Sequence, residues 1–153
     1  MEKETIEKTA ERSVSLFVSG YYCAESVLLA IAEEYGIQSK LIPKIATGFC
    51  SGTSRMCGQC GAVNGAILSI NLLTGRNDAN SSVEENYALV RKFFNLFEEK
   101  FGSTNCRELI GCDLGTEAGQ SYFKTHGLKK DCYNYTKEAT RMVLLLLTRS
   151  SER

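Results

Sequence analysis

The chain has 153 residues, a length that corresponds to about one domain and suffices to bury a hydrophobic core. Hydrophobic residues make up 43% and charged residues 24%, close to ordinary globular usage, so the composition excludes a disordered or fibrous chain. Lys and Arg number 18, as do Asp and Glu, and this zero net charge argues against a nucleic-acid partner. The unusual count is seven cysteines, and we therefore look for function in the thiols.

The sequence carries no recognisable export or membrane segment. Residues 1–12 alternate in charge and are followed by no apolar run long enough for a signal peptide. The longest aliphatic run, residues 142–147, is far shorter than the roughly 20 residues that a membrane span needs. We expect a cytoplasmic protein without a membrane partner. In a reducing cytosol, seven cysteines are metal ligands, redox thiols or buried side chains rather than a disulfide framework.

Apolar residues recur at helical spacing along the chain, and the alternation typical of strands is nearly absent. We therefore predict an all-α fold. The first predicted helix covers residues 6–18 and ends at Gly20. The second covers about residues 22–35 and ends before Gly36, and a short helical piece follows at residues 41–45.

Residues 48–61 contain four glycines and three cysteines, a composition that favours a loop. The next predicted helix, residues 61–73, is apolar on almost every face, as expected of a central buried helix. Gly61 and Gly65 lie four residues apart, so both would let another backbone approach one face of this helix closely.

The fifth predicted helix follows a turn at residues 74–78 and begins with a capping box of Ser82 and Glu85. It ends at Gly102. Apolar residues repeat along it with a 4-3-4-3-4 spacing, which predicts a seam for packing on another helix. The seam residues are Val83, Tyr87, Val90, Phe94, Phe97 and Phe101. This near-heptad pattern makes a homodimer an expected partner arrangement.

The last third contains a short turn at residues 106–110, which Asn105 precedes with Glu108 at capping spacing, and a weak helix at residues 116–125. A strong terminal helix follows, with Asp131 as its expected N-cap. We find no internal repeat or linker, so we predict one domain over residues 1–153, a bundle of about five to seven helices around the central apolar helix.

Four cysteines share a position at the start of a predicted helix. They are Cys23, Cys60, Cys106 and Cys132. Unpaired N–H groups and the helix dipole stabilise a thiolate there, so we expect lowered pKa values and raised nucleophilicity and metal affinity. If the helices converge, the four thiols form one site.

These cysteines also stand in a recognisable order. The segments that carry it are Tyr22-Cys23-Ala24-Glu25-Ser26-Val27-Leu28, Cys60-Gly61-Ala62-Val63-Asn64-Gly65-Ala66, Cys106-Arg107-Glu108-Leu109-Ile110-Gly111 and the isolated Cys132. Over about residues 15–145 the chain resembles the C_GCAxxG_C_C family of redox-active proteins. The resemblance implies a small helical protein whose family cysteines, by position Cys23, Cys60, Cys106 and Cys132, do redox work or hold a prosthetic group such as an iron–sulfur cluster.

Cys57, which lies outside the family pattern, forms a C-x-x-C pair with Cys60. Such a pair at a helix start can cycle between dithiol and disulfide, with Cys60 attacking and Cys57 resolving. As a zinc motif it is half complete, because no second C-x-x-C and no nearby His accompany it. The remaining thiols, Cys50 and Cys112, are expected to be buried or spectator groups.

We therefore expect electron transfer with an unidentified redox partner protein, through an iron–sulfur cluster bound by Cys23, Cys60, Cys106 and Cys132. Two alternatives stay open: dithiol–disulfide exchange through Cys57 and Cys60, and a structural zinc site without catalysis. The same thiols would serve an oxidoreductase or a simple electron carrier. A nucleotide cofactor is not expected, because the glycine-rich stretch has neither a preceding strand nor a following Gly-Lys-Ser/Thr.

Overall fold

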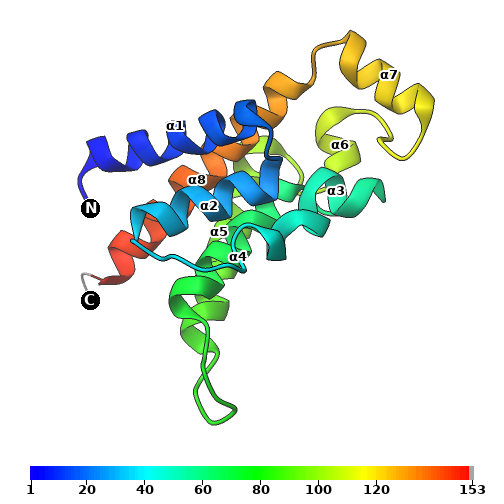
Figure 1. Ribbon diagram of the computed structural model, residues 1–153. Helices are drawn as coiled ribbons and strands as arrows, with labels where there is room; N and C mark the ends of the chain where they lie inside the picture. Colours follow the sequence, from blue (N-terminus) through cyan, green and yellow to red (C-terminus); the bar gives the residue numbers. More distant parts are fainter. Residues whose placement is uncertain (152–153) are drawn as a thin grey trace.

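The computed structural model describes residues 1–151, and these form helices and loops without a strand (Figure 1). The eight α-helices are α1 (Lys3–Ser19), α2 (Cys23–Glu34), α3 (Cys50–Arg55), α4 (Gly61–Thr74), α5 (Glu84–Phe101), α6 (Cys106–Ile110), α7 (Glu117–Thr125) and α8 (Lys129–Ser151). A 3-10 helix, Lys44–Phe49, precedes α3. The predicted all-α class is confirmed. The stretch predicted as a loop, residues 48–61, contains α3, and the 3-10 helix ends inside it.

Helices α2 and α4 form the centre of the molecule. The first half of α4 is buried without interruption from Gly61 to Ala66, as the apolar sequence predicted. The two helices approach closely at Gly65, where an added Cβ would lie 2.7 Å from the carbonyl oxygen of Ala24 and 2.9 Å from Cβ of Val27. Only glycine fits at this crossing, so the close approach predicted from the glycine spacing is confirmed.

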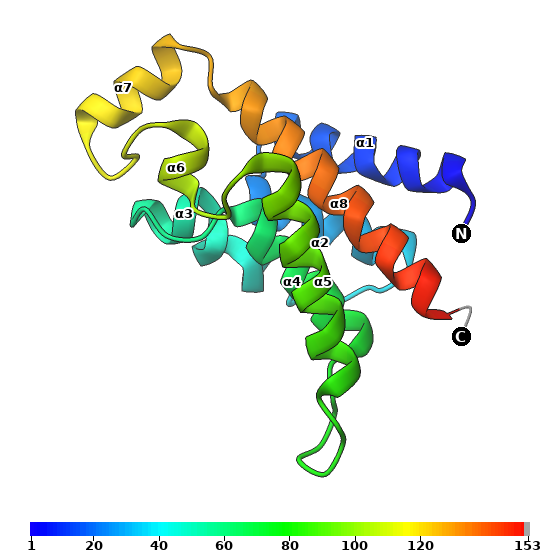
Figure 2. The ribbon, with the colours of Figure 1, turned by 180° about the vertical axis from the view of Figure 1, so that it is seen from behind.

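Helices α1, α5 and α8 complete the bundle around this pair (Figure 2). Their inward side chains join those of α2 and α4 in one hydrophobic cluster. A bidentate ion pair adds to the packing of α1 on α8: the Arg141 guanidinium donates from Nε and Nη2 to the two carboxylate oxygens of Glu7, both at 2.6 Å. Burial of this cluster supplies most of the driving force for folding.

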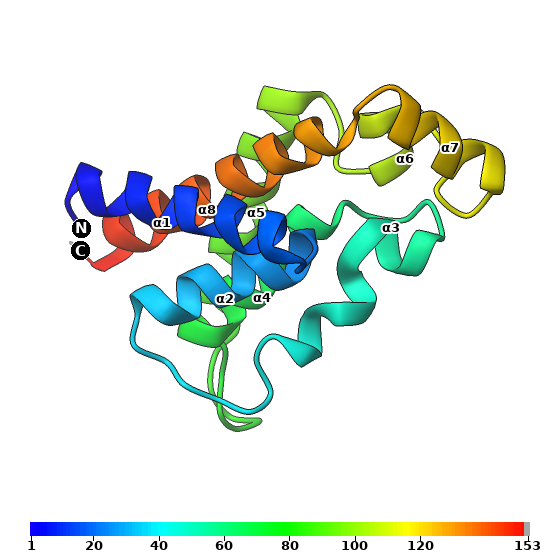
Figure 3. The ribbon, with the colours of Figure 1, turned by 45° about the horizontal axis from the view of Figure 1, so that its top comes forward.

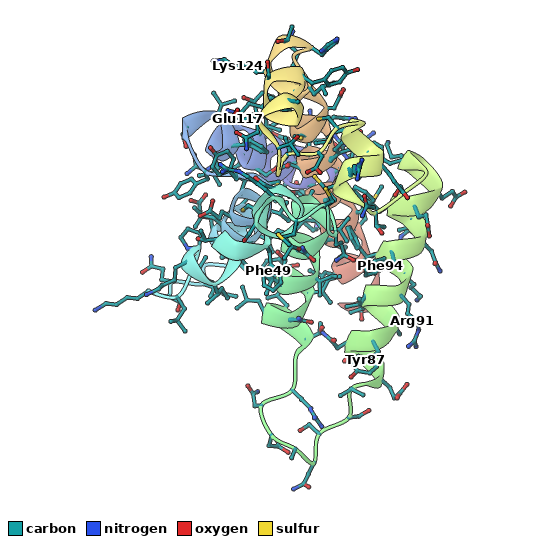
Figure 4. The ribbon with its side chains drawn as sticks, turned by 90° about the vertical axis from the view of Figure 1, so that its right-hand side faces the viewer. Phe49, Tyr87, Arg91, Phe94, Glu117 and Lys124 are labelled. Carbon is teal, nitrogen blue, oxygen red and sulfur yellow. The ribbon has the colours of Figure 1, made fainter. Side chains whose placement is uncertain are left out.

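Helix α5 buries a wider stripe than the predicted seam. Its buried residues are Leu89, Phe93 and Phe97, whereas Tyr87 is 52% exposed on the outer face (Figure 4). Of the predicted seam, Phe97 is buried, and three more residues pack against the core: Val90, Phe94 and Phe101. The seam is widened by Leu89 and Phe93 because α5 packs against both α4 and α8, which calls for a wide apolar stripe rather than a narrow one. The homodimer stays a prediction.

Two predicted helix caps differ in the structure. Helix α5 begins at Glu84, whose N–H donates to Ser82 Oγ at 3.1 Å, so Ser82 and Glu85 do not form the expected capping box. Helix α8 begins at Lys129, two residues before the expected cap Asp131. The start of α5 differs from the predicted one by one residue, and that of α8 by three residues, nearly a full turn.

The short helices α3, α6 and α7 gather at one end of the bundle, away from the two termini (Figure 3). The connection between α4 and α5 projects separately (Figure 1). Within residues 1–151, no helix has both the length and the hydropathy needed to cross a bilayer. The end of the bundle that carries the short helices is where the cysteines meet.

Candidate functional site

Four cysteines from four helices line one cavity. They are Cys23 of α2, Cys60 at the start of α4, Cys106 of α6 and Cys132 of α8. The cavity holds about 70 Å³ of free space, several times what one water molecule needs. The rest of its wall is mainly apolar and aromatic, from Phe17, Tyr22, Leu109, Ile110, Leu114, Phe123 and Tyr135. The four cysteines that the sequence placed at helix starts therefore line one cavity, although α8 begins three residues earlier than predicted.

The N-terminal ends of α2 and α4 lie against each other at Gly61. Cys23 is the first residue of α2 and Cys60 is the N-cap of α4. An added Cβ at Gly61 would lie 2.1 Å from Sγ of Cys23 and 3.1 Å from the carbonyl oxygen of Phe49. The missing side chain of Gly61 therefore makes the space in which the Cys23 sulfur sits.

Helix α6 is held against the start of α4 by backbone hydrogen bonds. The Cys60 N–H donates to the Thr104 oxygen at 2.7 Å, and the Cys106 N–H donates to the Gly58 oxygen at 2.9 Å. These two bonds cross-link the segments that precede α4 and α6. They place Cys60 and Cys106 next to each other although 45 residues separate them in the sequence.

Cys106 and Cys132 each occupy the first turn of their helix. Asn105 caps α6 through its side chain, which accepts the N–H of Glu108 at 3.1 Å, as its spacing predicted. Cys132 is the fourth residue of α8. Tyr135, one turn further along α8, donates its hydroxyl to the Leu109 oxygen of α6 at 3.0 Å and so joins the two helices beside the cavity.

The segment α3 that covers the cavity is a left-handed turn. Ser51, Gly52, Thr53 and Ser54 have φ angles of 56°, 64°, 59° and 55°. L-residues pay roughly 1–2 kcal/mol each in this region, and consecutive examples are uncommon. Gly52 packs directly on Cys106, since an added Cβ would lie 2.6 Å from the Cys106 Cβ. The turn therefore brings backbone, rather than side chains, against this thiol.

The electrostatics of the thiols differ from the prediction. Burial raises the pKa of the Cys60 thiol to about 12, and the N–H groups of Ala62 and Val63 oppose this rise only in part. Burial likewise raises the pKa of Cys106 to about 11 and raises that of Cys132, with neighbouring thiols acting in the same direction. The expected lowering of these pKa values was wrong, because loss of water around the thiolate outweighs the helix amides.

The C-x-x-C pair is not built like a dithiol at one helix tip. Cys60 faces the cavity, whereas Cys57 precedes the helix and is not among the residues that line the cavity. The Cys57 thiol donates a hydrogen bond to the Asp113 carboxylate, which raises the pKa of Cys57 and lowers that of Asp113. Arg107 lies beside the same thiol.

Cys50 was expected to be a buried or spectator thiol, and sequence reasoning missed that it lies beside Cys23. Cys50 is buried, and its thiol shares a hydrogen bond with that of Cys23, a contact that raises the pKa of Cys50. Cys112 is half-buried and near enough to Cys106 to affect its titration. The density of cysteines around residues 50–60 was the available indication, but no pattern of spacing pairs Cys50 with Cys23.

The arrangement of the four cavity cysteines indicates which kind of metal group they could bind. Across residues 1–151, no three His, Cys, Asp or Glu side chains converge closely enough to hold a single metal ion. The four cavity cysteines nevertheless surround a common space. Thiolates arranged around a space, rather than around a point, fit a group that offers several separate metal atoms.

Comparison with known proteins agrees with this arrangement. A family model described as "Putative redox-active protein (C_GCAxxG_C_C)" matches residues 21–145. An uncharacterised protein of the archaeon Archaeoglobus fulgidus is 30% identical over 115 residues, which cover 69% of this chain and 76% of that protein. No solved structure shows a significant match. Because the family match spans most of the chain and includes all four cavity cysteines, this protein belongs to the C_GCAxxG_C_C family.

Proposed function

We propose that this protein carries electrons by means of an iron–sulfur cluster held by Cys23, Cys60, Cys106 and Cys132. The observation that carries the proposal is that these four thiols, from four separate helices, line one apolar cavity. When bound, such a cluster supplies one-electron redox chemistry at a potential set by its surroundings. The family description as redox-active points in the same direction.

The spacing of the thiols favours a cluster over zinc. A structural zinc ion needs four ligands at one point, with Zn–S distances near 2.3 Å. A [4Fe–4S] cluster binds each of its four thiolates through a different iron, so its ligands stand further apart. The four thiols share a cavity without converging on one point, so their arrangement fits the wider ligand spacing of a cluster better than that of a zinc ion.

The chain's own residues have three tasks in this proposal. The aromatic and aliphatic wall excludes water, which protects a cluster and tunes its potential. The N–H groups of Ala62 and Val63 point toward Cys60 and favour its thiolate. Because burial keeps the free thiols protonated at neutral pH, metal binding releases those protons, and uptake is expected to strengthen as the pH rises.

The proposal includes a reducing compartment and a redox partner. All seven cysteines are free, and a reducing cytoplasm keeps them so. A partner protein would exchange electrons at the end of the bundle that carries α3, α6 and α7 (Figure 3), where residues of these helices help to line the cavity.

The test is anaerobic purification of the full chain, followed by a visible spectrum and analysis of iron, zinc and sulfide. A coloured protein with iron and sulfide, bleached by dithionite, is expected. Cys60→Ser should lose iron and visible absorbance together, whereas Cys112→Ser, which alters a thiol outside the cavity wall, should retain both.

Other outcomes would contradict the proposal. Stoichiometric zinc in a colourless protein would instead favour the structural site. A metal-free protein that loses two thiols on mild oxidation would favour dithiol exchange. Full iron content in Cys60→Ser would remove this residue from the ligand set.

A further inference from the structure

One contact between thiols lies outside the family's cysteine pattern. Cys50, at the start of α3, lies beside Cys23, the first residue of α2. The two residues are neighbours across Gly61: the point where a Gly61 Cβ would stand is 2.1 Å from Sγ of Cys23 and 3.2 Å from Cα of Cys50. Because Gly61 has no side chain, the two residues can approach each other across it.

The surroundings of Cys50 hold its thiol in this position. Its sulfur lies 3.7 Å from Oε1 of Glu25 and 3.7 Å from the carbonyl oxygen of Ala46. Glu25 is itself fixed, since it accepts the Tyr22 N–H at 3.1 Å and the Thr47 hydroxyl at 2.9 Å. Glu25 stands two residues after Cys23 on α2, so one helix turn orients both thiols.

The two thiols differ in access. Cys23 is 9% exposed and forms part of the cavity wall, whereas Cys50 is 5% exposed and lies behind it. A small oxidant that enters the cavity therefore meets Cys23 first. Cys50 is then the nearest thiol that can react with the product.

We propose that Cys23 and Cys50 form a reversible disulfide that withdraws Cys23 from the cavity site. The disulfide itself stands on the position of Cys23 and Cys50 on either side of Gly61, and only its effect on a bound group rests on the proposed function. An S–S bond is about 2.05 Å long, so the two side chains must rotate until their sulfurs reach that distance.

The reaction balances with hydrogen peroxide as the two-electron oxidant. The Cys23 sulfur attacks one peroxide oxygen, the O–O bond breaks, and one water leaves with the thiol proton, so that Cys23 becomes a sulfenic acid. The Cys50 sulfur then attacks the Cys23 sulfur, the S–O bond breaks, and the hydroxyl leaves as a second water with the Cys50 proton. Two thiols lose two electrons in total, and a dithiol reductant reverses the change.

The sequence allows the pairing to be read directly by mass spectrometry. Trypsin places Cys23 on the peptide of residues 13–40 and Cys50 on residues 45–55, while Cys57 and Cys60 share residues 56–76. Reduced, metal-free protein is treated with one or two equivalents of hydrogen peroxide, blocked with N-ethylmaleimide and digested without reductant. A cross-link between 13–40 and 45–55 is expected, and dithiothreitol should remove it.

Matched variants test the assignment. Cys50→Ser should abolish this cross-link, and Cys112→Ser should leave it at the wild-type level. The proposal is overturned if both peptides remain fully alkylated after peroxide treatment, or if the disulfide instead forms within residues 56–76.

A second arm separates this inference from the proposed function. Diamide, a mild thiol oxidant, is applied without oxygen to metal-free and to iron-loaded protein. The cross-link should form in the metal-free sample and be strongly suppressed in the iron-loaded one, where Cys23 is a ligand. Equal cross-linking in the two samples would show that the disulfide forms but does not compete with iron for Cys23, and would overturn that part of the proposal. A protein that takes up no iron would contradict the proposed function. The cross-linking of the metal-free sample would still show whether Cys23 and Cys50 form a disulfide.

Discussion

Gly61 is the residue whose replacement should reveal most directly how the site is packed. In Gly61→Ala the new Cβ would stand 2.1 Å from the Cys23 sulfur, whereas ordinary contacts begin near 3.4 Å. The sulfur, or one of the two helix starts, must therefore move by more than an ångström. Overpacking of this kind costs about 1–3 kcal/mol, and the better helix propensity of Ala offsets part of it, up to about 1 kcal/mol.

We expect Gly61→Ala to lower the free energy of unfolding by about 1–2 kcal/mol, or roughly 2–4 °C in Tm for each kcal/mol. Urea denaturation of the metal-free, reduced protein, followed by circular dichroism at 222 nm, measures this loss. Gly48→Ala is the matched control, because its Cβ would meet only Ser54 Oγ at 3.8 Å. Its effect should stay within about 0.5 kcal/mol.

A double-mutant cycle tests the cause. Cys23→Ala removes the sulfur that the new Cβ would strike, and the next contact, with the Phe49 oxygen at 3.1 Å, is tight by only a few tenths of an ångström. In that background Gly61→Ala should cost less than about 1 kcal/mol. The same penalty in both backgrounds, or none in either, would refute the packing described for this site.

Two further predictions concern stability. Cys60 ordinarily titrates near pH 9 but has a pKa of about 12 in the folded protein, so between these values the folded state binds the additional proton. Its contribution to stability is complete below pH 9 and falls above it by about 1.4 kcal/mol per pH unit. Urea midpoints at pH 8 and pH 10 should show this fall, and Cys60→Ser should reduce it; an identical fall in the variant would contradict the assignment. Arg141→Ala breaks the bidentate pair with Glu7 between α1 and α8, and should cost about 1–2 kcal/mol in the same assay. Arg12→Ala, which breaks an exposed pair with Glu33, should cost less than about 1 kcal/mol, and equal losses would show that burial of the first pair has no effect.

The sequence by itself determined the parts of the site that depend on local structure. Helical spacing and glycine positions located the starts of α2, α4 and α6 to within a residue, and with them Cys23, Cys60 and Cys106. The glycine pair in α4 predicted a close helix crossing because a missing side chain is visible in the sequence. Asn105 was predicted as a cap because a cap and its partner are only three residues apart.

Only the tertiary structure decided what depends on neighbours far along the chain. The pKa of Cys60 rises because other helices exclude water from its thiol, and a helix N-terminus in isolation predicts the opposite direction. The face that α5 buries depends on where α4 and α8 lie. The contact between Cys50 and Cys23 joins residues 27 positions apart through the space at Gly61, and no spacing rule connects them. Local sequence sets where a helix begins and which thiol stands there, but burial and proximity are properties of the packed chain.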